Sequence, residues 1–178
     1  MKHLLTALLV FMMQFHAAAQ DITQLDNEVS VRFPATVQTT ESDGGLLWIS
    51  DLDAADPGKG RCMAMRMEAA QVGLSTEELK DYADKPDFRE SFMNGLLKQL
   101  PGVQVTKQHI LRKNGMTVYD ILMEKDAPDE NFIYKYIYAL VYFREGAIYT
   151  VAVMEPEQTD SQAARQAFLN SFQTADRK

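Results

Sequence analysis

The chain has 178 residues, with 18 Lys and Arg against 25 Asp and Glu, and therefore a formal net charge of −7. This length is that of one ordinary domain, and an acidic chain without a Lys/Arg stripe argues against binding to nucleic acid or to anionic lipid surfaces, because both need clustered cations. The single cysteine, Cys62, excludes an intramolecular disulfide, so an apolar core must hold the fold together.

Residues 1–19 have the pattern of a secretory signal peptide. Lys2 supplies the positive n-region, residues 4–15 form an apolar h-region too short to span a membrane, and small residues follow at 17–19. We therefore expect cleavage before Gln20, a single mature domain over residues 20–178, and export to the periplasm or the extracellular space. The mature domain lacks a cysteine at its start, so we expect it to be soluble after export rather than lipid-anchored.

Three strands are predicted before the first helix, at residues 29–33, 46–52 and 61–70. The first stops at Pro34, which cannot donate to a strand ladder, so we expect this strand at or near a sheet edge. Breaker residues place a turn at residues 42–45 and a loop at residues 53–60. On the third strand the methionines alternate with other residues, which puts them on one face as core-filling side chains: Met63, Met65 and Met67.

Two helical segments come next. Ser75 and Glu78 have the spacing of a capping box, which predicts a helix through Ala83 that breaks or kinks at Pro86. A second helix is predicted over residues 87–100. Its apolar side chains fall four residues apart and form one stripe facing a core: Phe88, Phe92, Leu96 and Leu100.

Two hairpins follow the helices. Asn114-Gly115 is the strongest two-residue hairpin signal, because a type I′ turn needs positive φ at both positions. It joins predicted strands at residues 103–113 and 116–125, in a register that places His109 opposite Asp120 and Leu111 opposite Val118. The second hairpin turns near Glu145-Gly146 and joins strands at residues 132–144 and 147–154. Both faces of its first strand are apolar, so we expect this hairpin at the centre of a sheet covered on both sides.

The last predicted helix covers residues 160–174. Thr159 and Gln162 have capping-box spacing, and Ala164, Phe168 and Phe172 form the stripe expected to be buried. Antiparallel hairpins with separate helices are typical of an α+β protein. We predict a mainly antiparallel sheet of about seven strands, flanked by helices on both faces.

This layout resembles the PsbP-like (Mog/PsbP/DcrB-type) α/β/α sandwich family. The matching segments are residues 29–34 (VSVRFP), the helix that starts after Ser75, and residues 168–172 (FLNSF). The resemblance covers most of residues 28–174 and concerns packing features, so it transfers no functional residue. The family includes the extrinsic photosystem II protein, a nuclear Ran-binding protein, bacterial lipoproteins and effector-binding chaperones. The resemblance therefore implies a protein that binds and assists another protein rather than an enzyme.

The sequence gives little support for catalysis, a metal site or a cofactor. His109 is the one histidine of the mature domain, and we interpret it as a cross-strand partner of Asp120. Cys62 would need an adjacent base to act as a nucleophile, and nothing places His109 beside it. The acidic loop at residues 51–56 departs from the EF-hand pattern and is interpreted as a solvated turn. We predict no catalytic residue, no metal ligand and no cofactor.

Tyrosines recur along the predicted central strand, and one face is expected to carry Tyr134, Tyr136, Tyr138 and Tyr142. A tyrosine has an apolar body and a polar tip, which suits protein, peptide or carbohydrate surfaces. We expect Tyr138 and Tyr142 to pack under a helix, and Tyr134 and Tyr136 to lie at the exposed start of the strand. If they border a groove, Tyr134 and Tyr136 are the first candidates for a binding site.

Taken together, these features predict an exported, noncatalytic accessory or chaperone-like module that binds another exported or membrane protein. The alternative is a small-ligand-binding protein with a pocket between the sheet and the helices around Pro86. A hydrolase that uses His109 or acidic residues is the third hypothesis. The sequence names neither the partner nor the oligomeric state.

Overall fold

The computed structural model describes residues 22–42, 45–130, 132–144, 146–157 and 160–175. The predicted signal peptide, and Thr159 of the predicted last capping box, lie outside these residues.

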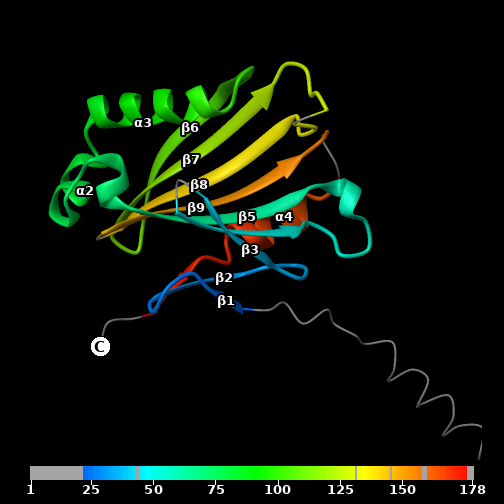
Figure 1. Ribbon diagram of the computed structural model, residues 1–178, viewed down its shortest axis with the longest axis horizontal. Coiled ribbons are helices and arrows are strands. Elements are labelled where there is room, and N and C mark those ends of the chain that lie inside the picture. Colours follow the sequence, from blue (N-terminus) through cyan, green and yellow to red (C-terminus); the bar gives the residue numbers. More distant parts are fainter. Residues whose placement is uncertain (1–21, 43–44, 131, 145, 158–159, 176–178) are drawn as a thin grey trace, which may run out of the picture.

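Seven antiparallel strands form the main sheet, as the sequence predicted (Figure 1). Their order across the sheet is β3 (Gln38–Ser42), β4 (Gly45–Asp51), β5 (Arg61–Glu68), β9 (Ala147–Glu155), β8 (Tyr136–Arg144), β7 (Met116–Lys125) and β6 (Val103–Lys113). The predicted central hairpin is confirmed, because β9 is the middle strand and β8 is its neighbour. The register of the β6–β7 hairpin is also confirmed, with His109 opposite Asp120 and Leu111 opposite Val118.

A second, three-stranded sheet was not predicted. It has the order β1 (Ile22–Gln24), β2 (Val29–Arg32) and β10 (Gln173–Thr174). The prediction that the first strand lies at a sheet edge is wrong, because β2 is paired on both sides and belongs to this small sheet. Its place at the edge of the main sheet is taken by β3, a polar strand that alternation did not reveal.

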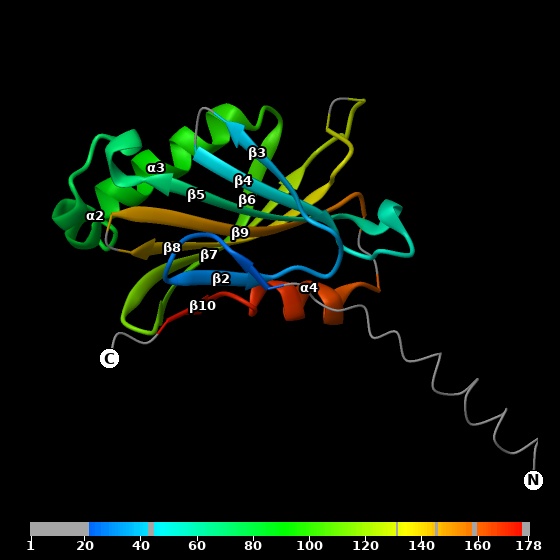
Figure 2. The same cartoon turned by 60° about the horizontal axis from the view of Figure 1, so that its bottom comes forward.

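The helices cover both faces of the main sheet (Figure 2). One face carries α2 (Thr76–Tyr82) and α3 (Pro86–Gln99), and the other carries the small sheet and α4 (Gln162–Leu169). The capping box of α2 is present: the Ser75 Oγ accepts from the Glu78 amide at 3.2 Å, and the Glu78 carboxylate accepts from the Ser75 amide at 2.8 Å. The predicted break at Pro86 is confirmed: α2 ends at Tyr82, and Pro86 is the first residue of α3, where its missing N–H is not needed.

The last helix is shorter than predicted. It ends at Leu169, and the chain then turns so that β10 can pair with β2. Phe172 therefore lies outside the helix, but its ring still enters the core and stacks on Tyr142 with centroids 3.8 Å apart. The second helical stripe is confirmed, because Phe88, Phe92, Leu96 and Leu100 all pack against the core on the α3 side.

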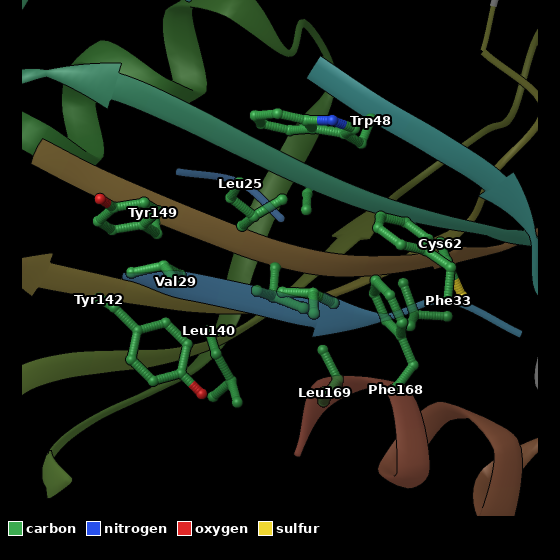
Figure 3. Close-up of a cluster of buried hydrophobic side chains, with 14 of the residues drawn as sticks. Leu25, Val29, Phe33, Trp48, Cys62, Leu140, Tyr142, Tyr149, Phe168 and Leu169 are labelled. Carbon is green, nitrogen blue, oxygen red and sulfur yellow. The ribbon is translucent and has the colours of Figure 1, made fainter. Parts of the chain in front are cut away.

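The main sheet separates two apolar cores, and β8 contributes to both. Its Ile137, Ala139, Val141 and Phe143 belong to the core under α2 and α3, whereas Leu140 and Tyr142 belong to the core under the small sheet. The second core also contains Trp48, Cys62, Tyr149, and the Phe33–Phe168 ring pair at 5.0 Å (Figure 3). A strand apolar on both faces is thus explained by a cover on each side.

Candidate functional site

On the small-sheet side, the cover of the main sheet is incomplete. The strand register aligns one row of side chains across the sheet, in the order Lys107, Leu122, Tyr138, Val153 and Cys62. Along this row Lys107 is exposed, the next two side chains are half-buried, and the last two are fully buried. Burial therefore increases from the β6 edge toward the middle of the sheet.

The neighbouring row shows the same gradient. His109 is exposed and Asp120 is half-buried, whereas Leu140, Val151 and Ala64 are buried. The small sheet and α4 thus cover this face on β4, β5 and β9 and also on part of β7 and β8, where Val118, Leu140 and Tyr142 are buried. We call the remainder on β6, β7 and β8 the open half-face, and it consists of Lys107, His109, Leu111, Asp120, Leu122, Glu124, Tyr136 and Tyr138.

Two of the predicted tyrosines lie on this open half-face. The rings of Tyr136 and Tyr138 have centroids 6.4 Å apart, and both side chains are half-buried. The Arg165 guanidinium of α4 lies over the Tyr138 ring, 4.0 Å from its centroid. Burial raises the pKa of Tyr138, and the charge of Arg165 opposes this shift. Tyr138 therefore marks the border where α4 ends the open half-face, as the prediction that it packs under a helix requires.

Tyr134 does not share the strand with Tyr136. β8 begins at Tyr136, four residues later than predicted, and Tyr134 lies in the loop that precedes it. The Tyr134 ring is half-buried and packs edge-on against Phe132, with centroids 5.5 Å apart. The structure thus places Tyr136 on the open half-face and Tyr134 beside the end of the sheet.

A buried ion pair anchors α4 at this border. The Glu155 carboxylate, in the row next to Tyr138 and directly opposite Tyr136, accepts from the Arg165 guanidinium at 2.7 Å. Glu155 is fully buried, and the Arg165 side chain is 11% exposed. This pair could not be predicted from the sequence, because the two residues come from different elements and neither belongs to a motif.

The groups considered for catalysis are far apart. His109 lies on β6 and Cys62 lies four strands away on β5, which corresponds to about 19 Å at the usual strand spacing. Burial raises the pKa of the Cys62 thiol, so the neutral form persists. Cys62 is fully buried as well, in agreement with its interpretation as an inert strand thiol.

The carboxylates of the acidic loop form ion pairs and a hydrogen bond with other groups of the same chain. Asp53 pairs with Lys59 at 2.8 Å, Asp51 pairs with Arg61 at 3.1 Å, and Asp56 accepts from the Gly58 amide at 3.2 Å. Within the part of the chain that the structure describes, no three His, Cys, Asp or Glu side chains converge in a way that would hold a metal ion.

The space predicted to hold a ligand, between the sheet and the helices around Pro86, is filled by aromatic side chains. Phe88 and Phe92 pack edge-on against Phe143, and the Tyr119 hydroxyl donates to the Ala83 carbonyl at 2.6 Å.

A pocket lies instead at the β6–β7 turn. It is open, has a volume of about 250 Å³, and is lined by Lys80, Arg112, Asn114, Gly115, Met116, Thr117, Phe143 and Arg144. Arg112 pairs with Asp84, and Arg144 pairs with Glu28. The three cations come from separate elements, so no spacing in the sequence revealed them.

Two cores about one antiparallel sheet, with helices on both faces, define an α+β sandwich of the PsbP-like type. One solved structure with this fold is the solution structure of cyanobacterial PsbP (CyanoP) from Synechocystis sp. PCC 6803. The two sequences are 12% identical. The structural alignment covers 89% of this chain and 95% of the CyanoP chain, with a TM-score of 0.57. This likeness establishes the fold.

Two further solved structures are less similar. A Pseudomonas aeruginosa protein of unknown function, PA94, titled a putative regulator, is 15% identical over 76% of this chain and 81% of its own, with a TM-score of 0.41. A Bacteroides thetaiotaomicron structure is 8% identical over 83% of this chain and 45% of its own, with a TM-score of 0.34. No family model matches the chain, and no curated protein does. Among the described residues, no helix has the length and apolar character needed to cross a membrane.

Proposed function

We propose that residues 20–178 form an exported, noncatalytic accessory or chaperone-like module that binds another envelope or secreted protein through the open half-face. The observation that carries this proposal is the incomplete cover of the main sheet, which leaves Tyr136, Tyr138 and Leu122 half-exposed, with Tyr138 under Arg165 of α4. Protein interfaces are enriched in aromatic side chains, which are surrounded by a polar rim. Tyr134, beside the end of the same strand, is proposed as a second contact.

The geometry favours binding over hydrolysis. The histidine and the cysteine that a nucleophilic mechanism would combine lie on strands about 19 Å apart, and the thiol is fully buried. His109 lies opposite Asp120 across the hairpin, and cross-strand pairs of this kind are common structural features of antiparallel sheets.

The export step has its own test. If residues 1–19 are a signal peptide, the intact mass of the protein recovered from the cell envelope or the medium corresponds to a chain that begins at Gln20. A mass that retains residues 1–19 after secretion contradicts the signal-peptide assignment.

Affinity capture from the native envelope tests the binding function. The mature protein is used as bait, and the double variant Tyr134→Ala/Tyr136→Ala is compared with Tyr82→Ala, which removes a 37% exposed tyrosine from α2 on the opposite side of the sheet. We expect one envelope protein to be captured by the unmodified bait and by Tyr82→Ala, and to be lost with the double variant. Unchanged capture by the double variant, or equal loss with both baits, rules out this surface.

A small-ligand-binding protein is the second candidate, because the turn pocket is lined by three cations. An anion is the ligand class that Lys80, Arg112 and Arg144 would favour. Calorimetric titration with inorganic phosphate tests it: saturable binding that is lost in Lys80→Ala supports the candidate, and the absence of heat contradicts it.

A further inference from the structure

β6 is an outer strand of unusual length for an edge. It has 11 residues, and in the described part of the chain its one strand neighbour is β7. The backbone amides and carbonyls on its outer side are therefore available to another strand, as at any open sheet edge.

The regular part of this edge is defined by a bulge. The register shifts between Val105 and Lys107, so the uninterrupted stretch runs from Lys107 to Lys113 and spans about 20 Å. Most of its side chains are exposed. They include Ile110 at 40% and Leu111 at 36%, which point to opposite faces of the sheet.

The charge of this edge is opposite to that of the whole chain. β6 contains Lys107, Arg112 and Lys113 and no acidic residue, although the chain as a whole carries −7. The pocket at the end of the hairpin adds Lys80, whereas Arg112 and Arg144 there are paired with Asp84 and Glu28. An acidic segment is therefore attracted to this edge, whereas a basic one is repelled.

The same charges disfavour a second copy of this chain. An antiparallel, two-fold pairing of two β6 strands centred on Ile110 would place Lys107 opposite Lys113 twice. Like charges directly opposite each other destabilise a strand pair, so the two lysines disfavour self-pairing in this register.

We infer that β6 binds an extended acidic segment of the partner protein, which adds to the main sheet as an eighth strand along Lys107–Lys113. This inference rests on the proposed function and names the chemistry of the partner. Lys107 and Lys113 lie on the face that continues into the open half-face, so acidic side chains on that face of the segment meet both lysines. Apolar side chains on the other face of the segment meet Ile110.

A peptide of defined sequence tests the inference. The probe is a blocked peptide of about ten residues that alternates glutamate with valine, and its control replaces every glutamate with lysine. We expect the glutamate peptide to bind at least about tenfold more tightly at low ionic strength. Hydrogen exchange should show new protection at β6 amides alone. A third peptide, N-methylated at every residue, should lose binding because neither of its backbone edges can donate hydrogen bonds to β6.

A matched pair of variants separates the edge from overall charge. Lys107→Glu and Lys98→Glu change the net charge equally, and Lys98 is exposed on α3. We expect Lys107→Glu to weaken binding of the glutamate peptide about tenfold and Lys98→Glu to leave it nearly unchanged. Equal effects of the two variants, equal binding of the lysine or N-methylated peptide, protection outside β6, or no binding would each overturn the inference. Concentration-dependent protection of β6 without peptide would overturn it too, because the occupant would then be a second copy.

The two proposals fail in different ways. If the envelope partner is captured through the tyrosines but the peptide does not protect β6, the edge inference alone is wrong. If the peptide binds β6 but no envelope partner is captured, the edge chemistry stands and the proposed function fails.

Discussion

Glu155 is a fully buried carboxylate, and its charge is balanced by the guanidinium of Arg165. Removing two charges from water is costly, and their mutual attraction offsets that cost only when the geometry is good. Here the guanidinium lies between the carboxylate and the Tyr138 ring, so both its charge and its flat face are used. The pair fixes the place where α4 meets the sheet and thereby sets the border of the open half-face.

Removal of Arg165 is predicted to be strongly destabilising. Arg165→Met leaves the Glu155 charge buried without the guanidinium, so we expect the free energy of unfolding to fall by about 3–5 kcal/mol. Arg112→Met removes an arginine whose pair with Asp84 is exposed, and should cost less than about 1 kcal/mol. Urea unfolding measures the free energy of unfolding of both variants. Similar decreases in the two variants would show that the Glu155–Arg165 pair does not contribute more to stability than an exposed pair.

Asp26 connects the small sheet to the main sheet. Its carboxylate accepts hydrogen bonds from the Tyr149 hydroxyl, from the amides of Glu28 and Val29 at 2.7 and 2.8 Å, and from Arg66 Nε at 3.4 Å. Burial by itself would raise the pKa of Asp26. The hydrogen bonds and the charge of Arg66 outweigh burial, so the pKa lies below the ordinary value of 3.8.

This lowered pKa predicts a pH dependence of stability. Because the folded state favours the ionised form, the contribution of Asp26 is fully present above pH 3.8 and is lost as the pH falls through the lower pKa of the folded state. We expect Asp26→Asn to lower the free energy of unfolding by about 2 kcal/mol at neutral pH and to converge with the unmodified protein below pH 3.8. Asp81→Asn on α2 is the control. A constant gap between Asp26→Asn and the unmodified protein down to pH 2 would contradict the assignment.

At the scale of elements, local signals predicted the hairpins well. Asn114 and Gly115 have φ of 51° and 76°, as a type I′ turn requires, and this turn sets the register of β6 on β7 from Lys113 back to the bulge before Lys107. β1, β3 and β10 were missed because they are short and polar; β1 and β3 pair with the strands that follow them, and β10 also depends on a distant partner, β2. The end of α4 was misplaced for a related reason: the apolar spacing continues to Phe172, but pairing of β10 with β2 draws the chain out of the helix.

The candidate site was predictable only in part. The periodic tyrosines identified the strand, and Tyr136 and Tyr138 do share its face. Which of them is covered depends on how far α4 and the small sheet extend across the main sheet. That extent results from long-range packing, which the sequence pattern of β8 does not encode.

Two turn glycines are predicted to differ sharply in their tolerance of a side chain. Both Gly45 and Gly115 have positive φ, but a Cβ on Gly45 would lie 2.1 Å from the Arg66 carbonyl oxygen, whereas a Cβ on Gly115 would meet nothing within 4 Å. Gly115→Ala should therefore cost about 1 kcal/mol, from backbone strain alone. Gly45→Ala should cost at least about 3 kcal/mol, because β4 and β5 must separate locally. Thermal unfolding monitored by circular dichroism compares the two, and equal losses would contradict the close approach of Gly45 to β5.

At the scale of the whole molecule, the open surface and the open edge are contiguous. The helix layer covers one face of the main sheet, while the smaller layer of α4 and the small sheet leaves part of the other face open toward β6. At the opposite edge, β3 has only five residues. An acidic protein with one long basic edge next to an uncovered aromatic face has a built-in polarity, which favours association with an acidic partner over association with itself.

This polarity predicts the behaviour of the protein at high concentration. The unmodified mature domain should remain monomeric, because the β6 pairing centred on Ile110 would place Lys107 opposite Lys113 in both halves of the pair. Lys107→Thr removes both repulsions and adds a residue that favours strands. The flat stretch with Ile110 and Leu111 is then free to pair, and we expect the association constant of the dimer to rise about tenfold.

Sedimentation velocity over a range of concentrations measures this association constant, with Lys98→Thr as the control for the lost charge. Added salt should shift the unmodified protein in the same direction, since it screens the exposed lysines. A dimeric unmodified protein, or equal behaviour of the two variants, would show that the lysines do not guard this edge.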